Sequence, residues 1–274
     1  LKSAKGNDSI KLPLSVVSSR IQAQFAKSEK LTTETKIIAE NDLPIAIVLS
    51  DLGQNQLYNP LLSLSWQYGD RVDQKIARKQ SKELLEKYYK EEVYKENFDA
   101  FNYQLGSGGI TLLPYSSEEL ELSDRIASNG AEEFDKESLS QYLFQKLENK
   151  TSGREDISFA LFGLASLKKP VLPRFDAWLK REDLSIKEKL YLAQALFNLG
   201  AEEWARDIFY KVISEKGEKK DNNIIINAGK KMDYVFSATA IASVLASSLN
   251  APERDGLWNY LINNQELWGN KKNS

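Results

Sequence analysis

The sequence predicts an all-α protein, and three observations support this prediction. Nearly every extended segment of the 274 residues repeats its apolar side chains at helical rather than alternating spacing. Residues typical of helix starts and helix ends separate these segments. Two of the segments also repeat each other at an offset of 35 residues: Ala160-Leu161-Phe162-Gly163-Leu164 and Ala195-Leu196-Phe197-Asn198-Leu199. A chain built from repeated helical hairpins produces such a repeat.

The predicted helices follow one another with short turns between them, as in stacked helical hairpins. They cover residues 16–25, 74–89, 116–129, 135–147, 157–167, 170–179, 185–199, 204–212, 235–249 and 257–262. Ser116–Glu119 and Ser185–Glu188 each have the pattern of a capping box, and Asp135 precedes its helix as an N-cap. Gly130 and Gly200 are expected to end two of the helices.

Two segments interrupt the helices, and neither divides the chain. Gly106–Tyr115 is a glycine-rich loop, and the polar, lysine-rich Glu215–Asn223 predicts an exposed loop. Asn223–Asn227 is rich in Ile, resembles a strand and is ambiguous. We therefore expect one all-α domain over residues 1–274, with N-terminal helices at 1–60 and a helical core at 61–262. Because the first residue is Leu rather than Met, we also expect the chain to be a fragment of a longer protein.

The composition excludes several kinds of chemistry. The chain has no cysteine and no histidine, so disulfides, thiolate nucleophiles, cysteine zinc sites and Ser–His–Asp triads are impossible. Its 37 basic and 39 acidic residues are nearly balanced, which argues against a nucleic-acid partner. The longest apolar run, Leu43–Leu49, is too short to span a membrane. Calcium-loop and phosphate-loop patterns are also missing, so we expect no metal and no cofactor.

One segment carries a resemblance to a known family. In Leu61–Gln74, the residues Tyr68-Gly69-Asp70 and Asp73-Gln74 resemble the Tyr-Gly-Cys-x-Glu-Gln motif of alpha-2-macroglobulin and complement thioester domains, with a one-residue insertion. Gly108-Gly109-Ile110, followed by Glu119–Ser123, looks like the glycine-glycine-aromatic signature that this family shares with terpenoid cyclases and protein prenyltransferases. The resemblance covers residues 60 to 262. It implies an α/α toroid, a ring of inner and outer helices built from helical hairpins.

The departures from the family are informative. A thioester joins a cysteine sulfur to a glutamine side chain, and here Asp70 stands where the cysteine would be. The zinc ligands of prenyltransferases are Asp, Cys and His, of which this chain has only the first type. The Asp-x-Asp-Asp motif of squalene-type cyclases is absent as well. The resemblance therefore implies the scaffold without the family's covalent chemistry.

Several residues have both a functional and a structural interpretation. Tyr68, Gly69, Asp70, Asp73 and Gln74 form the candidate thioester-equivalent region at the mouth of the toroid, while the structural interpretation makes Asp70 the N-cap of the next helix. The candidate pocket residues are Gly108, Gly109, Tyr115, Glu119, Glu121 and Asp124. Paired carboxylates hydrolyse glycosides, but acids are also favoured in the first turn of a helix. The aromatic stretch from Trp66 to Tyr103 is assigned to packing between helices.

These observations leave three functional hypotheses. The first is a non-catalytic binding or structural module of a bacterial cell-surface or secreted protein, with a protein or a glycan as ligand. The second is a polysaccharide-acting enzyme that uses Glu119, Glu121 or Asp124. The third is a peptide-binding scaffold similar to tetratricopeptide repeats, because the 35-residue offset is close to their period.

Overall fold

The computed structural model describes residues 2–3, 6–7, 52–94, 98–149 and 152–264. The backbone contacts divide the chain into two units, Leu1–Asn55 and Gln56–Ser274. In the first unit, the short strands β1 (Lys2–Ser3) and β2 (Gly6–Asn7) pair antiparallel. The helix predicted over residues 16–25 lies outside the described residues.

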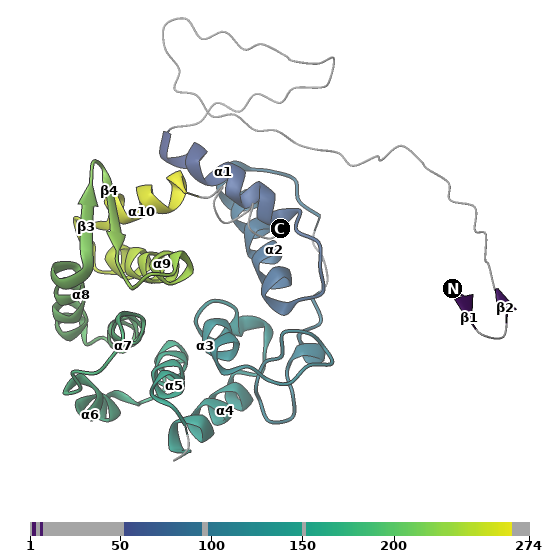
Figure 1. The fold of residues 1–274 in the computed structure, drawn as a ribbon, viewed down its shortest axis with the longest axis horizontal. Helices are drawn as coiled ribbons and strands as arrows, with labels where there is room; N and C mark the ends of the chain where they lie inside the picture. Colours follow the sequence, from purple (N-terminus) through teal and green to yellow (C-terminus); the bar gives the residue numbers. More distant parts are fainter. Residues whose placement is uncertain (1, 4–5, 8–51, 95–97, 150–151, 265–274) are drawn as a thin grey trace, which may run out of the picture. The chain divides into compact units, whose positions relative to one another are not determined.

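The second unit is mostly helical, which confirms the all-α prediction (Figure 1). The α-helices of the described residues are α1 (Leu52–Ser65, which begins in the first unit), α2 (Val72–Leu84), α3 (Leu120–Asn129), α4 (Lys136–Glu148), α5 (Arg154–Ser166), α6 (Phe175–Leu179), α7 (Ile186–Asn198), α8 (Glu202–Lys216), α9 (Met232–Ser248) and α10 (Arg254–Asn263). A π-helical turn, Leu85–Tyr89, extends α2, and short 3₁₀ turns lie at Ala100–Tyr103, Ala131–Glu133 and Leu172–Arg174.

A β-hairpin replaces the exposed loop predicted at Glu215–Asn223, so that prediction was wrong. Strand β3 (Gly217–Lys220) pairs antiparallel with β4 (Asn223–Ile226), the segment that was ambiguous in the sequence. Alternate residues of β4 face the core, where Ile224 and Ile226 are buried. The Thr239 hydroxyl of α9 accepts a hydrogen bond from the Ile226 amide at 3.0 Å. The buried isoleucines therefore hold the charged strand β3 on the surface.

Alternate helices of the chain, from α3 to α9, pack against one another in a row (Figure 1). Helix α3 contacts α5, α5 contacts α7, and α7 contacts α9, while α4, α8 and α10 pack on the side of this row. The Lys187 ammonium at the start of α7 lies 3.5 Å from Glu155 at the start of α5. Lys168, just after α5, donates to the Asn198 carbonyl at the end of α7 at 2.5 Å. These contacts at both ends show that α5 and α7 are parallel.

The 35-residue repeat occupies neighbouring helices of this row. Its first copy lies in α5 and its second in the last turns of α7. Gly163 of the first copy allows close packing, because a Cβ there would stand only 2.8 Å from Leu143 Cδ1 of α4 and 3.2 Å from Asp124 Cα of α3. Asn198 takes the equivalent place in the second copy, at the end of α7. The repeat thus reflects two successive helices of the same layer.

Of the N-terminal caps predicted at Ser116, Asp135 and Ser185, the last two are present. Ser185 and Glu188 form the predicted capping box at the start of α7, and Asp135 caps α4 through the amides of Glu137 and Ser138. The box predicted at Ser116–Glu119 was wrong, because α3 begins only after Glu119. The Glu119 amide donates to the Ile110 carbonyl at 2.9 Å, and Glu119 itself is extended, with φ −120° and ψ 127°.

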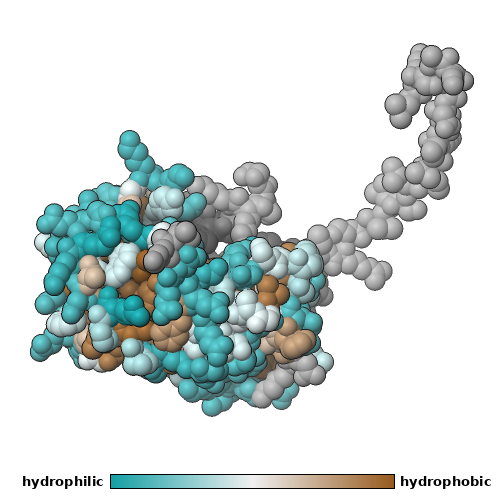
Figure 2. All heavy atoms as spheres, turned by 90° about the horizontal axis from the view of Figure 1, so that it is seen from below, coloured by the Kyte–Doolittle hydropathy of each residue, from teal (hydrophilic) through white to brown (hydrophobic). Residues whose placement is uncertain are grey.

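The surface below the row of helices exposes some apolar side chains. In the view from below, apolar areas lie among hydrophilic residues (Figure 2). Helices α4 and α6 lie on this side of the molecule in Figure 1. Their residues Phe144, Leu147, Trp178 and Leu179 are partly buried and pack against the core. Among the residues that the structure describes, no helix is both long enough and apolar enough to cross a membrane.

Candidate functional site

Residues of α2 and α3 line one cleft. The Val72 amide at the start of α2 donates to the Leu112 carbonyl, in the segment before α3, at 2.9 Å. At their far ends, Lys79 pairs with Glu133, and the Gln80 side chain donates to the Asn129 carbonyl. A cleft of about 290 Å³ lies between the two helices. It is lined by Arg71, Asp73, Ile76, Ala77, Gln80, Leu112, Glu119, Glu121, Leu122, Arg125, Ile126, Asn129 and Gly130.

Two segments that the sequence singled out separately meet in this cleft. Arg71 and Asp73 come from the thioester-like segment, and Glu119 and Glu121 come from the acidic start of α3. The Arg71 guanidinium holds the Asp73 carboxylate through two hydrogen bonds of 2.7 and 3.1 Å. The structure therefore places the predicted Asp73, Glu119 and Glu121 around one space.

The other residues of the thioester-like segment lie at the start of α2. Tyr68 is exposed, and Gly69 has φ +142°, where a side chain would collide with Gln74 Oε1. The Asp70 carbonyl accepts a hydrogen bond from the Tyr103 hydroxyl at 2.7 Å, and its exposed carboxylate lies 3.4 Å from Lys75 Nζ. The Gln74 side chain thus folds back over Gly69.

Asp70 is not the N-cap of α2, so the structural interpretation of this residue was wrong. The N-cap position falls to Arg71, and helical residues begin at Val72. The physical reason is that the Leu112 carbonyl already accepts the hydrogen bond of the Val72 amide. The first turn of α2 is therefore anchored by a neighbouring segment rather than by the Asp70 side chain.

Glu121 belongs to an ion-pair network that links three helices. Its carboxylate lies 2.6 Å from Arg125 on the same helix and 2.8 Å from Lys187 on α7. Lys187 also pairs with Glu155 of α5 at 3.5 Å and lies over the ring of Phe159. Partial burial acts to raise the pKa of Glu121, but the hydrogen bond from Lys187 and the charges of Arg125 and Lys187 outweigh it and hold the pKa below its usual value.

Asp124 lies one turn further along α3 and is completely buried. Among the described residues, neither of its carboxylate oxygens has a hydrogen-bond partner. Burial raises the pKa of this carboxyl group well above its usual value, against the opposing charges of Arg125 and Lys187. Its Cα and Cβ lie against Gly163 of α5, and Asp124 does not line the cleft. Helical spacing placed Glu121 and Asp124 on one face, but only Glu121 reaches the cleft.

The three remaining candidate pocket residues lie away from the cleft. Gly108 is buried against α4 with φ +88°, where a Cβ would collide with the Ser138 carbonyl. Gly109 is buried between Glu118 and Tyr142. Tyr115 is exposed. The glycine-rich loop therefore serves close packing against α4.

The aromatic stretch divides between core and surface. Tyr103 is buried and Phe98 stacks on it with 5.8 Å between the ring centroids, which confirms the packing prediction for these two residues. The prediction was wrong for Trp66, Tyr88, Tyr94 and Phe101, which are 55–87% exposed. Trp66 and Tyr94 lie outside the helices and Phe101 lies in a 3₁₀ turn, where helical spacing does not place side chains between helices.

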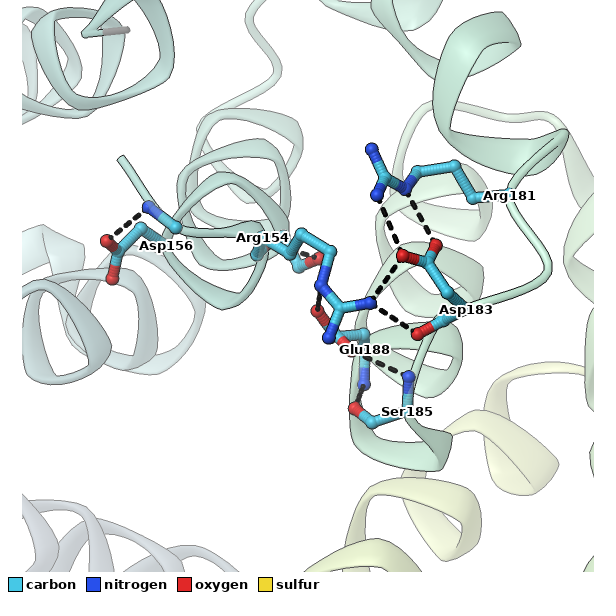
Figure 3. Close-up of polar contacts among 8 residues, drawn as sticks. Arg154, Asp156, Arg181, Asp183, Ser185 and Glu188 are labelled. Atoms are coloured by element: carbon cyan, nitrogen blue, oxygen red, sulfur yellow. Dashed lines mark hydrogen bonds and ion pairs between the residues drawn. The ribbon is translucent and has the colours of Figure 1, made fainter. Parts of the chain in front are cut away.

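A second charged cluster at the starts of α5 and α7 has no counterpart in the sequence predictions (Figure 3). Asp183 accepts two hydrogen bonds of 2.9 Å from Arg181 and pairs with Arg154 at 2.7 Å. Arg154 also faces Glu188 at 4.0 Å, the residue that closes the capping box with Ser185. The hydrogen bond from Arg181, followed by that from Arg154, holds the pKa of Asp183 far below its usual value. Only the Ser185–Glu188 pattern marked this region in the sequence.

A second cavity of about 540 Å³ lies at the base of the β-hairpin. It is bounded by the start of α7, the end of α8 and the segment before α9. Its charged side chains are engaged locally: Lys189 lies 3.3 Å from Glu215, and Asn227 donates to Glu218 at 2.6 Å. None of the candidate thioester-equivalent or pocket residues lines this cavity.

The α-helices of the described residues after α1 share one electrostatic feature at their starts. Each carries an acidic residue in its first turn, such as Asp73 in α2, Glu121 in α3 and Glu188 in α7. Acids at these positions offset the positive end of the helix dipole. This arrangement supports the structural interpretation of the first-turn acids.

The arrangement holds no metal centre of the usual kind. Among the described ranges of the chain, no group of three or more Asp and Glu side chains could bind a metal ion together. Comparison of the chain with protein-family models, with curated proteins and with solved structures finds no match in any of the three.

Proposed function

We propose that this chain is a non-catalytic binding module, and that the cleft between α2 and α3 is its binding site. In this proposal it is an α/α toroid similar to a thioester domain that has lost its thioester, within a larger cell-surface or secreted bacterial protein. The observation that carries the proposal is the cleft itself, where side chains of the thioester-like segment meet the acidic start of α3 over an aliphatic floor.

The charge arrangement favours binding over carboxylate catalysis. A glycosidase needs an acid of raised pKa facing the substrate and a second carboxylate about 5–10 Å away. Glu121 faces the cleft, but its pKa is lowered by ion pairs. Asp124 has the raised pKa, but it is buried and lies outside the cleft. A catalytic acid must face the substrate and also have a raised pKa. Glu121 meets only the first condition and Asp124 only the second.

The packing of the helices supports the proposed toroid. A toroid alternates inner and outer helices, and the row α3, α5, α7 and α9 with α4, α8 and α10 beside it has this alternation. An open helical-repeat scaffold shares the alternation but leaves the two ends of the row apart. An experimental structure in which the helix row closes on itself would support the toroid, and an open superhelix would favour the scaffold.

The binding function is tested with a random heptapeptide library displayed on phage. The full chain is compared with an Ala77→Trp variant, in which the indole fills the cleft. We expect the chain to enrich peptides that lose binding to the variant. Enrichment of the same peptides by both proteins would contradict the proposed site. Turnover of any member of a polysaccharide panel by the unmodified chain, abolished by Glu121→Gln, would instead support the enzyme.

A further inference from the structure

The cleft between α2 and α3 is long enough to hold a short segment of extended polypeptide. It follows α2 from Arg71 to Gln80 and α3 from Glu119 to Asn129. Ten helical residues span about 15 Å, which is the length of roughly four to five residues of extended chain. The contact between Gln80 and Asn129 closes the far end, so the charged side chains gather at the end where both helices begin.

The lining favours a polypeptide over a sugar or an anion. Ile76, Ala77, Leu122 and Ile126 give it an aliphatic floor, and among the described residues that line it none is aromatic. Apolar pockets with a few placed polar groups bind aliphatic side chains and fix their orientation. The acids in the first turns of α2 and α3 oppose the positive helix ends that would otherwise attract an anion.

One charge in the cleft has no partner to neutralise it. Arg71 pairs with Asp73, and Arg125 pairs with Glu121. Lys187, which contacts Glu121 from α7, is itself shared with Glu155. Glu119 is exposed and has no ion-pair partner in the described part of the chain. The cleft therefore offers one free carboxylate beside an aliphatic floor.

We propose that the cleft binds an extended segment of a partner protein in which a lysine or arginine lies two residues from an aliphatic residue, so that both side chains face the cleft. The basic side chain pairs with Glu119, and the aliphatic side chain lies on Ile76, Leu122 and Ile126. This inference rests on the proposed function and adds to it the chemical class of the ligand. Charge complementarity at Glu119 provides the specificity.

Two charge-reversed variants of the full chain test this inference. Glu119→Lys reverses the free charge of the cleft. Glu203→Lys is the matched control, because Glu203, like Glu119, is an exposed glutamate at the start of a helix, here α8, and lies outside the cleft. Each protein is panned against the heptapeptide library, and enriched peptides are synthesised and titrated by fluorescence anisotropy. Circular dichroism confirms that each variant folds, and Ala77→Met replaces Ala77→Trp if the latter does not.

We expect the wild type and Glu203→Lys to enrich the same peptides, which contain Lys or Arg two positions from Leu, Ile or Val. Glu119→Lys should bind these peptides about fivefold more weakly, the upper range for an exposed ion pair, and should select acidic peptides instead. Cleft-dependent peptides without a basic residue, or equal binding by Glu119→Lys, would overturn the inference and leave the binding function intact. The absence of any ligand sensitive to the Ala77 variants would overturn both. A glycan that binds the cleft in place of peptides would overturn the inference and leave the binding function intact.

Discussion

The Lys187 ammonium lies 2.8 Å from the Glu121 carboxylate and so joins the first turn of α7 to the first turn of α3 across 66 residues of sequence. The same ammonium group contacts Glu155 of α5 and lies 5.0 and 5.8 Å from the ring centroids of Phe159 and Tyr191. One partly buried lysine therefore fixes the relative positions of three helices.

Replacing this lysine should weaken the fold. We expect Lys187→Met to lower the free energy of unfolding by about 1–2 kcal/mol, because it removes an ion pair shared by two acids and a cation–π contact. The control is Lys136→Met, which breaks an exposed pair within one turn and should cost at most about 0.5 kcal/mol. Urea denaturation at pH 7 measures both, and equal losses would contradict the role of Lys187.

The ion pair between Lys187 and Glu121 should make the free energy of unfolding depend on pH in the acidic range. The pKa of Glu121 is lower in the folded state than in the unfolded chain, so its contribution is present above the unfolded pKa, near 4.3, and is lost as the pH falls through the folded pKa. We expect the loss of stability on acidification below about pH 4.5 to be smaller in Lys187→Met than in the wild type. If the free energy of unfolding falls equally with pH in the two proteins, the result would argue against the pairing of Lys187 with Glu121.

Asp124 should make the free energy of unfolding fall as the pH rises, opposite to the effect of Glu121. Its folded pKa is raised, so the folded chain keeps a proton that the unfolded chain loses, and stability falls as the pH rises toward the folded pKa. We expect Asp124→Asn to remove this dependence. The variant should gain on the order of 1 kcal/mol at pH 7.5, the scale of an unpaired buried polar group, and little near pH 4. A variant that is less stable at both pH values would show that Asp124 has a partner in solution.

The glycine-rich loop offers a test of its packing role. Gly108→Ala places a methyl group against the Ser138 carbonyl at a backbone φ of +88°, and we expect it to cost about 2–4 kcal/mol. Gly106, in the same loop, has open space where a Cβ would be, so Gly106→Ala should be neutral or stabilise by up to about 1 kcal/mol. Thermal unfolding of the two variants compares them directly. Similar melting temperatures would mean that the loop does not press on α4.

The helices could be predicted from the sequence because their signals are local. Apolar spacing, the Ser185–Glu188 box and the Asp135 cap all depend on residues a few positions apart. The box at Ser116–Glu119 has the same local signal, yet it fails because the Glu119 amide bonds to Ile110, nine residues earlier. Strand β3 was missed because its charged side chains carry no hydrophobic pattern, and β4 supplies the buried residues.

The candidate site could be predicted only in pieces. Asp73, Glu119 and Glu121 were each singled out, but their meeting depends on how α2 and the start of α3 are placed in the fold, which spacing within either helix does not encode. The same limit applies to Asp124, whose helical face is turned toward α5 because Gly163 lets the two backbones approach. The contact between Lys187 and Glu121 likewise arises from packing of distant helices.

The starts of α3, α5 and α7, which Lys187 joins and which each carry an acid, also affect how fast a partner arrives. Three dipoles pointing the same way would build a positive field that draws anions from a distance. Here each dipole is offset within its first turn, so a partner approaching from beyond a Debye length of about 8 Å meets little net field. We therefore expect added salt to change the dissociation rate of a basic peptide, through its contact with Glu119, more than its association rate.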